Sequence, residues 1–167
     1  MKKVFIGIDN GVSGSIGIIT PSTVYFGKTP TFVQQDFQKK KKNITRVAHS
    51  ELYELLRLHT YGFEASEIMV ALERPMINPQ RYTATISAVR AWESTLITLE
   101  SLGLPYQVVD SKEWQKKVLP QGVKGSPELK KASLDVGNRL FPQFKEIKHE
   151  DRDGMLIAEY LRLIYIN

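Results

Sequence analysis

The chain contains no cysteine, and its apolar runs are short. Without cysteine it has no disulfide, no thiolate nucleophile and no cysteine-based zinc site. The apolar segment that follows the first lysines ends at Asp9, too early for a signal peptide, and no other stretch approaches a membrane span. Acidic residues are in the minority as well, because 18 Asp and Glu stand against 23 Lys and Arg, a formal charge of +5. We therefore expect a cytoplasmic protein without membrane attachment, with a polyanion as its partner.

The 167 residues are enough for one domain with a full hydrophobic core, and we expect residues 1–167 to form one. Apolar runs predict strands over residues 4–9, 15–20, 22–26, 67–73 and 106–110. Helical spacing of apolar residues predicts helices over residues 46–59, 80–102 and 112–118, from residue 126 onward, and from about 150 to 165. Residues 27–43, with the lysine run Lys39–Lys42, are interpreted as a loop. This order predicts an α/β fold, a mixed sheet with helices on both faces.

Carboxylates stand at the ends of two of these apolar strands. Asp9 ends Val-Phe-Ile-Gly-Ile-Asp, and Glu73 ends Met-Val-Ala-Leu-Glu. An ionised acid beside apolar sequence is costly unless a cation or several donors satisfy it. Asp9 has a second interpretation as a turn residue, because Asp bonds its own backbone in tight turns. Glu73 is more informative, because glutamate is a poor strand former.

More acids begin the last predicted helix, in the segment His-Glu-Asp-Arg-Asp-Gly. Glu150 and Asp153 are three residues apart and would share a face of the first helical turn. Acids at this place also complement the helix dipole without any further function. Carboxylates that converge in one place repel one another, however, and Mg²⁺ prefers such oxygen ligands. Together with Asp9 and Glu73, these acids predict a metal-dependent nuclease.

The ordered motifs resemble the RuvC-like Holliday-junction resolvases, in particular their phage-type members. The resemblance rests on Val-Phe-Ile-Gly-Ile-Asp-Asn-Gly, Glu73-Arg74-Pro75 and the late Asp-x-Asp-Gly-Met-Leu-Ile-Ala helix. It implies a ribonuclease-H-like fold with a five-stranded sheet, a homodimer and two-metal hydrolysis of branched DNA. It also implies that Asp9, Glu73 and Asp153 are the first, second and last metal-binding acids, holding two Mg²⁺ ions for which Mn²⁺ substitutes.

The third acid departs from the family pattern. The family places Asp, or sometimes His, three residues before the last acid, where this chain has Glu150. We assign Glu150 as the third ligand from the helical spacing and keep Asp151 as the alternate, with His149 beside them. The glycine after Asp153, Gly154, weakens a helix but permits close approach to a neighbour.

Basic residues suggest where DNA binds. Six lysines and two glutamates lie between residues 111 and 131, around a glycine-containing loop and a helix start. By the resemblance, lysines of this region hold phosphates, and we favour Lys116, Lys124 and Lys131. The segment 76–82 adds Arg81 and Tyr82 as further candidates for DNA contact. Tyr82 either stacks on bases in the junction core or packs at a helix start. The lysine run Lys39–Lys42 either grips a distal DNA arm or blunts a sheet edge.

The main hypothesis is therefore a structure-selective endodeoxyribonuclease that cleaves four-way junctions and other branched DNA, acts in the cytoplasm (of the host, if phage-encoded) and needs no small-molecule cofactor. One alternative is a monomeric ribonuclease-H-like enzyme acting on RNA–DNA hybrids. Another is a junction-binding protein without catalysis. Sugar kinases and actin-like ATPases also begin with a strand ending in Asp-x-Gly, but they need two such lobes.

Overall fold

A mixed five-stranded sheet lies at the centre of the computed structural model, which describes residues 1–37 and 42–166. The strand order is β3-β2-β1-β6-β7. The strands are β1 (Val4–Ile8), β2 (Ser15–Ile19), β3 (Val24–Lys28), β6 (Ile68–Glu73) and β7 (Tyr106–Val109). β2 is antiparallel to β1 and β3, whereas β6 is parallel to β1 and β7 is parallel to β6. The predicted mixed sheet is thus confirmed.

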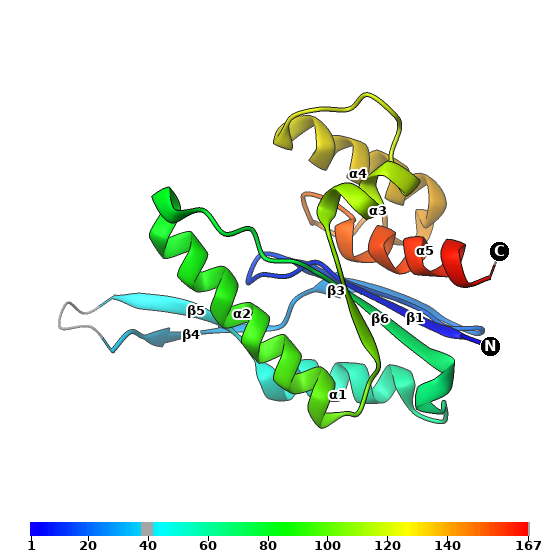
Figure 1. Ribbon diagram of the computed structural model, residues 1–167, viewed down its shortest axis with the longest axis horizontal. Coiled ribbons are helices and arrows are strands. Elements are labelled where there is room, and N and C mark those ends of the chain that lie inside the picture. The colour runs from blue at the N-terminus through cyan, green and yellow to red at the C-terminus, as the bar shows by residue number, and fades with distance from the viewer. Residues whose placement is uncertain (38–41, 167) are drawn as a thin grey trace.

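Helices cover both faces of this sheet, as Figure 1 shows. One face carries α1 (His49–Thr60) and α2 (Tyr82–Ser101). The other carries α3 (Ser111–Val118), α4 (Ser126–Leu140) and α5 (Asp153–Tyr165). Among the residues that the structure describes, none of the helices is both long and apolar enough to cross a membrane.

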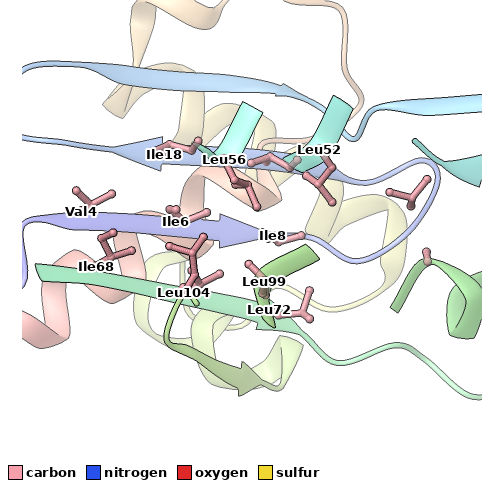
Figure 2. Close-up of a cluster of buried hydrophobic side chains, with 14 residues drawn as sticks. Val4, Ile6, Ile8, Ile18, Leu52, Leu56, Ile68, Leu72, Leu99 and Leu104 are labelled. Atoms are coloured by element: carbon pink, nitrogen blue, oxygen red, sulfur yellow. The ribbon is translucent and has the colours of Figure 1, made fainter. Parts of the chain in front are cut away.

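The two faces of β1 and β6 explain why these strands are apolar throughout. Alternate residues of a strand point to opposite faces, so a strand covered on both sides needs an unbroken apolar run. Val4, Ile6 and Ile8 pack toward α1 and α2 (Figure 2), whereas Phe5 packs toward the other helices. All four are at most 1% exposed. The sheet is therefore a rigid platform with a buried layer on each side.

A second, two-stranded sheet was not predicted. It is a hairpin of β4 (Thr31–Gln35) and β5 (Asn43–Val47), in the region interpreted as a loop. Because Arg46 and Val47 belong to β5, the following helix begins at His49 rather than at Arg46. The strands of the hairpin are mostly exposed, so they lack the apolar pattern that identifies buried strands. Within the lysine run, Lys39–Lys41 lie outside the described residues.

Helix boundaries lie within three residues of the predicted ones. Gly103, two residues after the last residue of α2, has φ 62°, as expected for a glycine that ends a helix. α3 is capped by Asp110, which accepts a hydrogen bond from the Lys112 amide at 3.0 Å. α5 begins at Asp153, so the expectation that this helix starts near Glu150 is wrong. That shift changes which acid faces the end of β1.

Candidate metal centre

Asp9 and Glu73 leave the sheet side by side. β1 and β6 are parallel neighbours with Ile8 opposite Leu72, so the next residues of both strands lie at the same sheet edge. The carboxyl ends of parallel strands are where sites of α/β proteins are commonly built. The Asp9 side chain is also close enough to Glu73 for the two charges to interact, and the Glu73 charge raises the pKa of Asp9. The structure thus brings these two predicted acids together at one sheet edge.

The start of α5 brings two more acids to this edge. α5 packs across β1 and β2, and Asp153 is its first residue. Asp9, Asp151 and Asp153 each offer a carboxylate oxygen, and these oxygens lie within 4.8 Å of one another. Mg²⁺ and Ca²⁺ hold oxygens at about 2.0–2.6 Å, so ligands on opposite sides of such an ion are about 4–5 Å apart. This spacing and donor set fit a divalent cation.

A close contact between α5 and the sheet makes this approach possible. A Cβ atom built on Gly154 would lie 2.4 Å from the Ser15 carbonyl oxygen. The Gly154 amide also donates to Ser15 Oγ at 3.0 Å. The helix therefore rests directly on the backbone of β2, and any larger residue would push Asp153 away from Asp9. The expectation that Gly154 permits close approach is confirmed.

The electrostatics of the acid group favour a cation. The pKa of Asp9 is raised well above its usual value, first by burial and then by the charges of Glu73 and Asp153. Burial and the Asp151 charge raise the pKa of Asp153 to about 7. Burial likewise raises the pKa of Glu73. Carboxylates in this state resist ionisation until positive charge is supplied beside them.

The structure places Glu150 outside this group. Its side chain is 59% exposed and pairs with Lys130 Nζ at 2.5 Å. Residues 150–152 precede the helix, and Arg152 has the non-helical φ of −129°, so the spacing argument that favoured Glu150 does not apply. Asp151, the alternate, is the acid that joins Asp9 and Asp153.

His149 supports Asp151 rather than replacing it. Its Nδ1 atom lies 3.3 Å from Asp151 Oδ1. Burial is the largest single influence and raises the pKa of Asp151. The hydrogen bonds from His149 and from the Asp153 amide, together with the charges of His149 and Lys130, outweigh burial, so the net pKa of Asp151 is lowered. The hydrogen bond with Asp151 raises the pKa of His149. Among the three alternatives, Asp151 is therefore the one held ionised and directed at the site.

Arg152 is buried despite its charge, with 1% of its surface exposed. Its guanidinium stacks over the Phe26 ring, 4.9 Å from the centroid. At 2.9–3.1 Å the side chain donates to Asn138 Oδ1 and to the carbonyls of Asp151, Phe144 and Ile147. These hydrogen bonds hold the backbone before α5 in one conformation, and they thereby fix the direction of the Asp151 side chain.

Two further side chains orient the acids and were missed as functional residues. Trp114 is fully buried, and its Nε1 donates to Glu73 Oε1 at 2.8 Å. Ser133 Oγ donates to Asp153 Oδ1 and accepts from the Arg152 amide. Neither partnership has a sequence signal, because each joins elements that are far apart in the chain.

The predicted DNA-binding residues are all exposed. Lys116 lies on α3, Lys124 in the following loop and Lys131 on α4, and all three are exposed. Arg81 and Tyr82 lie where α2 begins, and Tyr82 is 72% exposed, so it does not pack at the helix start. Lys130, which was not among the favoured lysines, lies beside the acids, with Nζ 3.9 Å from Asp151 Oδ2.

Comparison with known proteins shows the fold of the chain. Neither a protein-family model nor a curated protein sequence matches it. Among solved structures, Thermus thermophilus RuvC in complex with a Holliday-junction substrate is similar, with a TM-score of 0.56, 13% identity, and coverage of 95% of this chain and 92% of the other. A further structure of Thermus thermophilus RuvC matches with a TM-score of 0.49, 13% identity and coverage of 98% and 93%. The chain therefore has a RuvC-like, ribonuclease-H-like α/β fold.

Proposed function

We propose that this chain is a divalent-metal-dependent endonuclease that cleaves branched DNA. The observation that carries the proposal is the group of Asp9, Asp151 and Asp153 beside Glu73, at the carboxyl ends of two parallel strands. Four carboxylates in one partly buried place suit hard cations better than any other partner. The fold shared with RuvC, which was solved with a Holliday junction, supports the choice of substrate.

The residues of the site would have two roles in hydrolysis, holding metal ions and orienting the residues that hold them. Asp9, Glu73, Asp151 and Asp153 would hold two Mg²⁺ ions, with Mn²⁺ as a substitute. Bound divalent cations supply Lewis-acid chemistry, which activates water and stabilises charge on the leaving oxygen of the phosphodiester. Trp114 and Ser133 donate hydrogen bonds to the Glu73 and Asp153 carboxylates, which orients these two acids.

Positive charge around the acids would hold the DNA. Lys116, Lys124, Lys131 and Lys130 are candidates for phosphate contacts on α3, α4 and the loop between them. Arg81 and Tyr82 are further candidates, where α2 begins. Such contacts predict binding that weakens steeply with salt. A homodimer would present two sites to two strands of equal polarity, which suits a four-way junction.

The test is cleavage of a labelled panel: a four-way junction, a fork, a linear duplex and an RNA–DNA hybrid, each with and without Mg²⁺. We expect the wild-type chain to cut the branched DNAs only with Mg²⁺, and Glu73→Gln to lose this activity. Glu54→Gln is the matched control, because Glu54 lies on α1, is exposed and pairs with Arg57.

Three results would contradict the proposal. Cleavage by Glu73→Gln at the wild-type rate refutes the role of the acids. Cleavage of the hybrid alone by a monomer of 19.0 kDa favours a ribonuclease H. Tight binding of junctions without cleavage in Mg²⁺ or Mn²⁺ favours a binding protein.

A further inference from the structure

The β4–β5 hairpin has no part in the proposed reaction, yet it stands at the end of the molecule where the acids lie. β5 packs against α2, and Figure 1 shows the hairpin extending past the main sheet beside the first turns of that helix. The main sheet contains neither strand of the hairpin. A projecting element at this place would meet any DNA that approaches the acids.

A hollow of about 580 Å³ lies between the hairpin and the first half of α2, and we call it the hairpin groove. Its apolar lining includes Val12, Phe37, Ile44, Tyr82 and Ile86. Two of these are exposed aromatic side chains, Phe37 from the hairpin at 86% and Tyr82 from α2 at 72%. Lys42 and Arg90 contribute positive charge.

The hairpin groove continues toward the acid group. Val12, three residues after Asp9, also lines a second hollow of about 650 Å³. That hollow is bordered by Gly14 and His149. Its charged side chains are the basic Lys28 and Lys148 and the acidic Glu150, which pairs with Lys130. One residue thus forms the boundary between the two hollows. A strand that leaves the acid group along this side would pass Val12 and enter the hairpin groove.

The chemistry of the groove suits a nucleotide strand. The Arg90 guanidinium lies 5.9 Å from the centroid of the Phe37 ring, so a cation and an aromatic face stand together. The acid of the lining, Asp36, is 8% exposed, and its Oδ1 accepts from the Phe37 amide at 2.8 Å, so the accessible charge is positive. Aromatic faces for bases together with cations for phosphates are typical of single-strand binding surfaces.

A second copy of the chain fits this groove less well. Association through the same surface of two copies would set each copy's Lys42 and Arg90 near those of the other. Like charges brought together in this way oppose the contact. A polyanion has no such penalty, and its bases can use the exposed rings.

We propose that the hairpin groove binds an unpaired nucleotide of the DNA, which stacks on Phe37 while Arg90 and Lys42 contact its phosphates. The identification of the strand as part of a branched substrate rests on the proposed function. This nucleotide-binding site is formed by the hairpin and α2, and it is separate from the acids and from the lysines of α3 and α4.

The test measures binding by fluorescence anisotropy in EDTA, with a labelled oligothymidylate and a duplex of the same length as probes. We expect Phe37→Ala and Phe37→Leu to weaken oligothymidylate binding about tenfold, because both remove the ring. Duplex binding should stay within about twofold, since phosphate contacts elsewhere carry it. Val33→Ala is the control, because Val33 is 64% exposed on β4 and does not line the groove.

Binding of oligothymidylate by Phe37→Ala at the wild-type affinity would overturn the inference. A second result would also overturn the inference: Phe37→Ala has a different molar mass from the wild-type chain in light scattering, but binds oligothymidylate as the wild type does. That result would identify the groove as a contact between copies of the chain. Because Phe37 is largely exposed, its substitution leaves the core intact. The assay needs no cleavage, so a chain that cuts no DNA but binds through Phe37 refutes the proposed function alone.

Discussion

Asp151 and Glu150 are adjacent in sequence but lie in different surroundings. Asp151 is buried and directed at Asp9 and Asp153, whereas Glu150 is exposed and paired with Lys130. We expect Asp151→Asn to lower cleavage at least about 100-fold and to weaken Mn²⁺ binding in calorimetry, because loss of even an outer-shell partner costs about 10–100-fold. Glu150→Gln should retain most of the activity. The reverse ranking would restore Glu150 as the third ligand.

Trp114 tests whether the buried donor to Glu73 matters for catalysis. Trp114→Phe keeps an aromatic ring in the core but removes the N–H that bonds Glu73 Oε1. We expect the cleavage rate to fall about tenfold, as for other groups that orient metal ligands. The melting temperature should fall as well, because Phe is smaller. Leu119→Ala, a cavity in the same core cluster, is the comparison: it should lower stability with the cleavage rate nearly unchanged at low temperature.

An equal loss of rate in both variants would show that Trp114 acts through packing alone. A Trp114→Phe variant with full activity would show that Glu73 keeps its orientation without this donor. Either result would remove Trp114 from the positioning residues and leave it a core residue.

At the scale of elements, the contact between α5 and β2 sets two effects against each other. Replacing Gly154 by Ala improves helix propensity by about 1 kcal/mol. The added Cβ would, however, lie 2.4 Å from the Ser15 carbonyl oxygen, and neither backbone can give way cheaply. We expect the steric term to prevail, with a net loss of stability of about 1–3 kcal/mol. Urea unfolding measures the change.

The same substitution should separate the acids. If α5 moves off the sheet, Asp153 moves with it, and Mn²⁺ affinity falls even where the variant remains folded. A Gly154→Ala protein that is more stable than wild type would contradict the geometry of this contact, because propensity alone would then decide the outcome.

The elements differ in how far the sequence predicts them. β1 and β6 are buried on both faces, so their apolar runs identify them directly, and with them Asp9 and Glu73. The hairpin is exposed and takes its support from α2, which no local pattern records. The third acid depends on where α5 begins, and that start is set by contacts of Ser133 and Arg152 with distant segments. Local patterns therefore predict the platform and the candidate acids Asp9, Glu73 and Asp153, whereas tertiary contacts decide which further acid joins them.

At the scale of the whole molecule, stability should depend on pH through the acid group. The pKa of Asp153 is about 7 in the folded chain against a usual 3.8, and that of Asp9 is raised in the same direction. The folded state therefore binds more protons than the unfolded state between these values, so the free energy of unfolding falls as pH rises. His149, also with a raised pKa, adds stability below its usual 6.5 that is lost as pH rises through its folded value. Asp151 has a lowered pKa, so the stability that it contributes is present above 3.8 and is lost only as pH falls below that value, outside this range.

In EDTA we therefore expect a lower melting temperature at about pH 8 than at about pH 5.5, each kcal/mol corresponding to about 2–4 °C in a chain of this size. Mg²⁺ should raise the melting temperature more at the higher pH, because it binds the ionised carboxylates and stabilises the state that holds it. The double variant Asp9→Asn, Asp153→Asn should lose most of both effects, since it removes the two raised carboxyls. A wild-type melting temperature in EDTA that rises with pH across this range would mean that the acids are ionised without a cation. The case for a metal centre at this sheet edge would then lose its electrostatic basis.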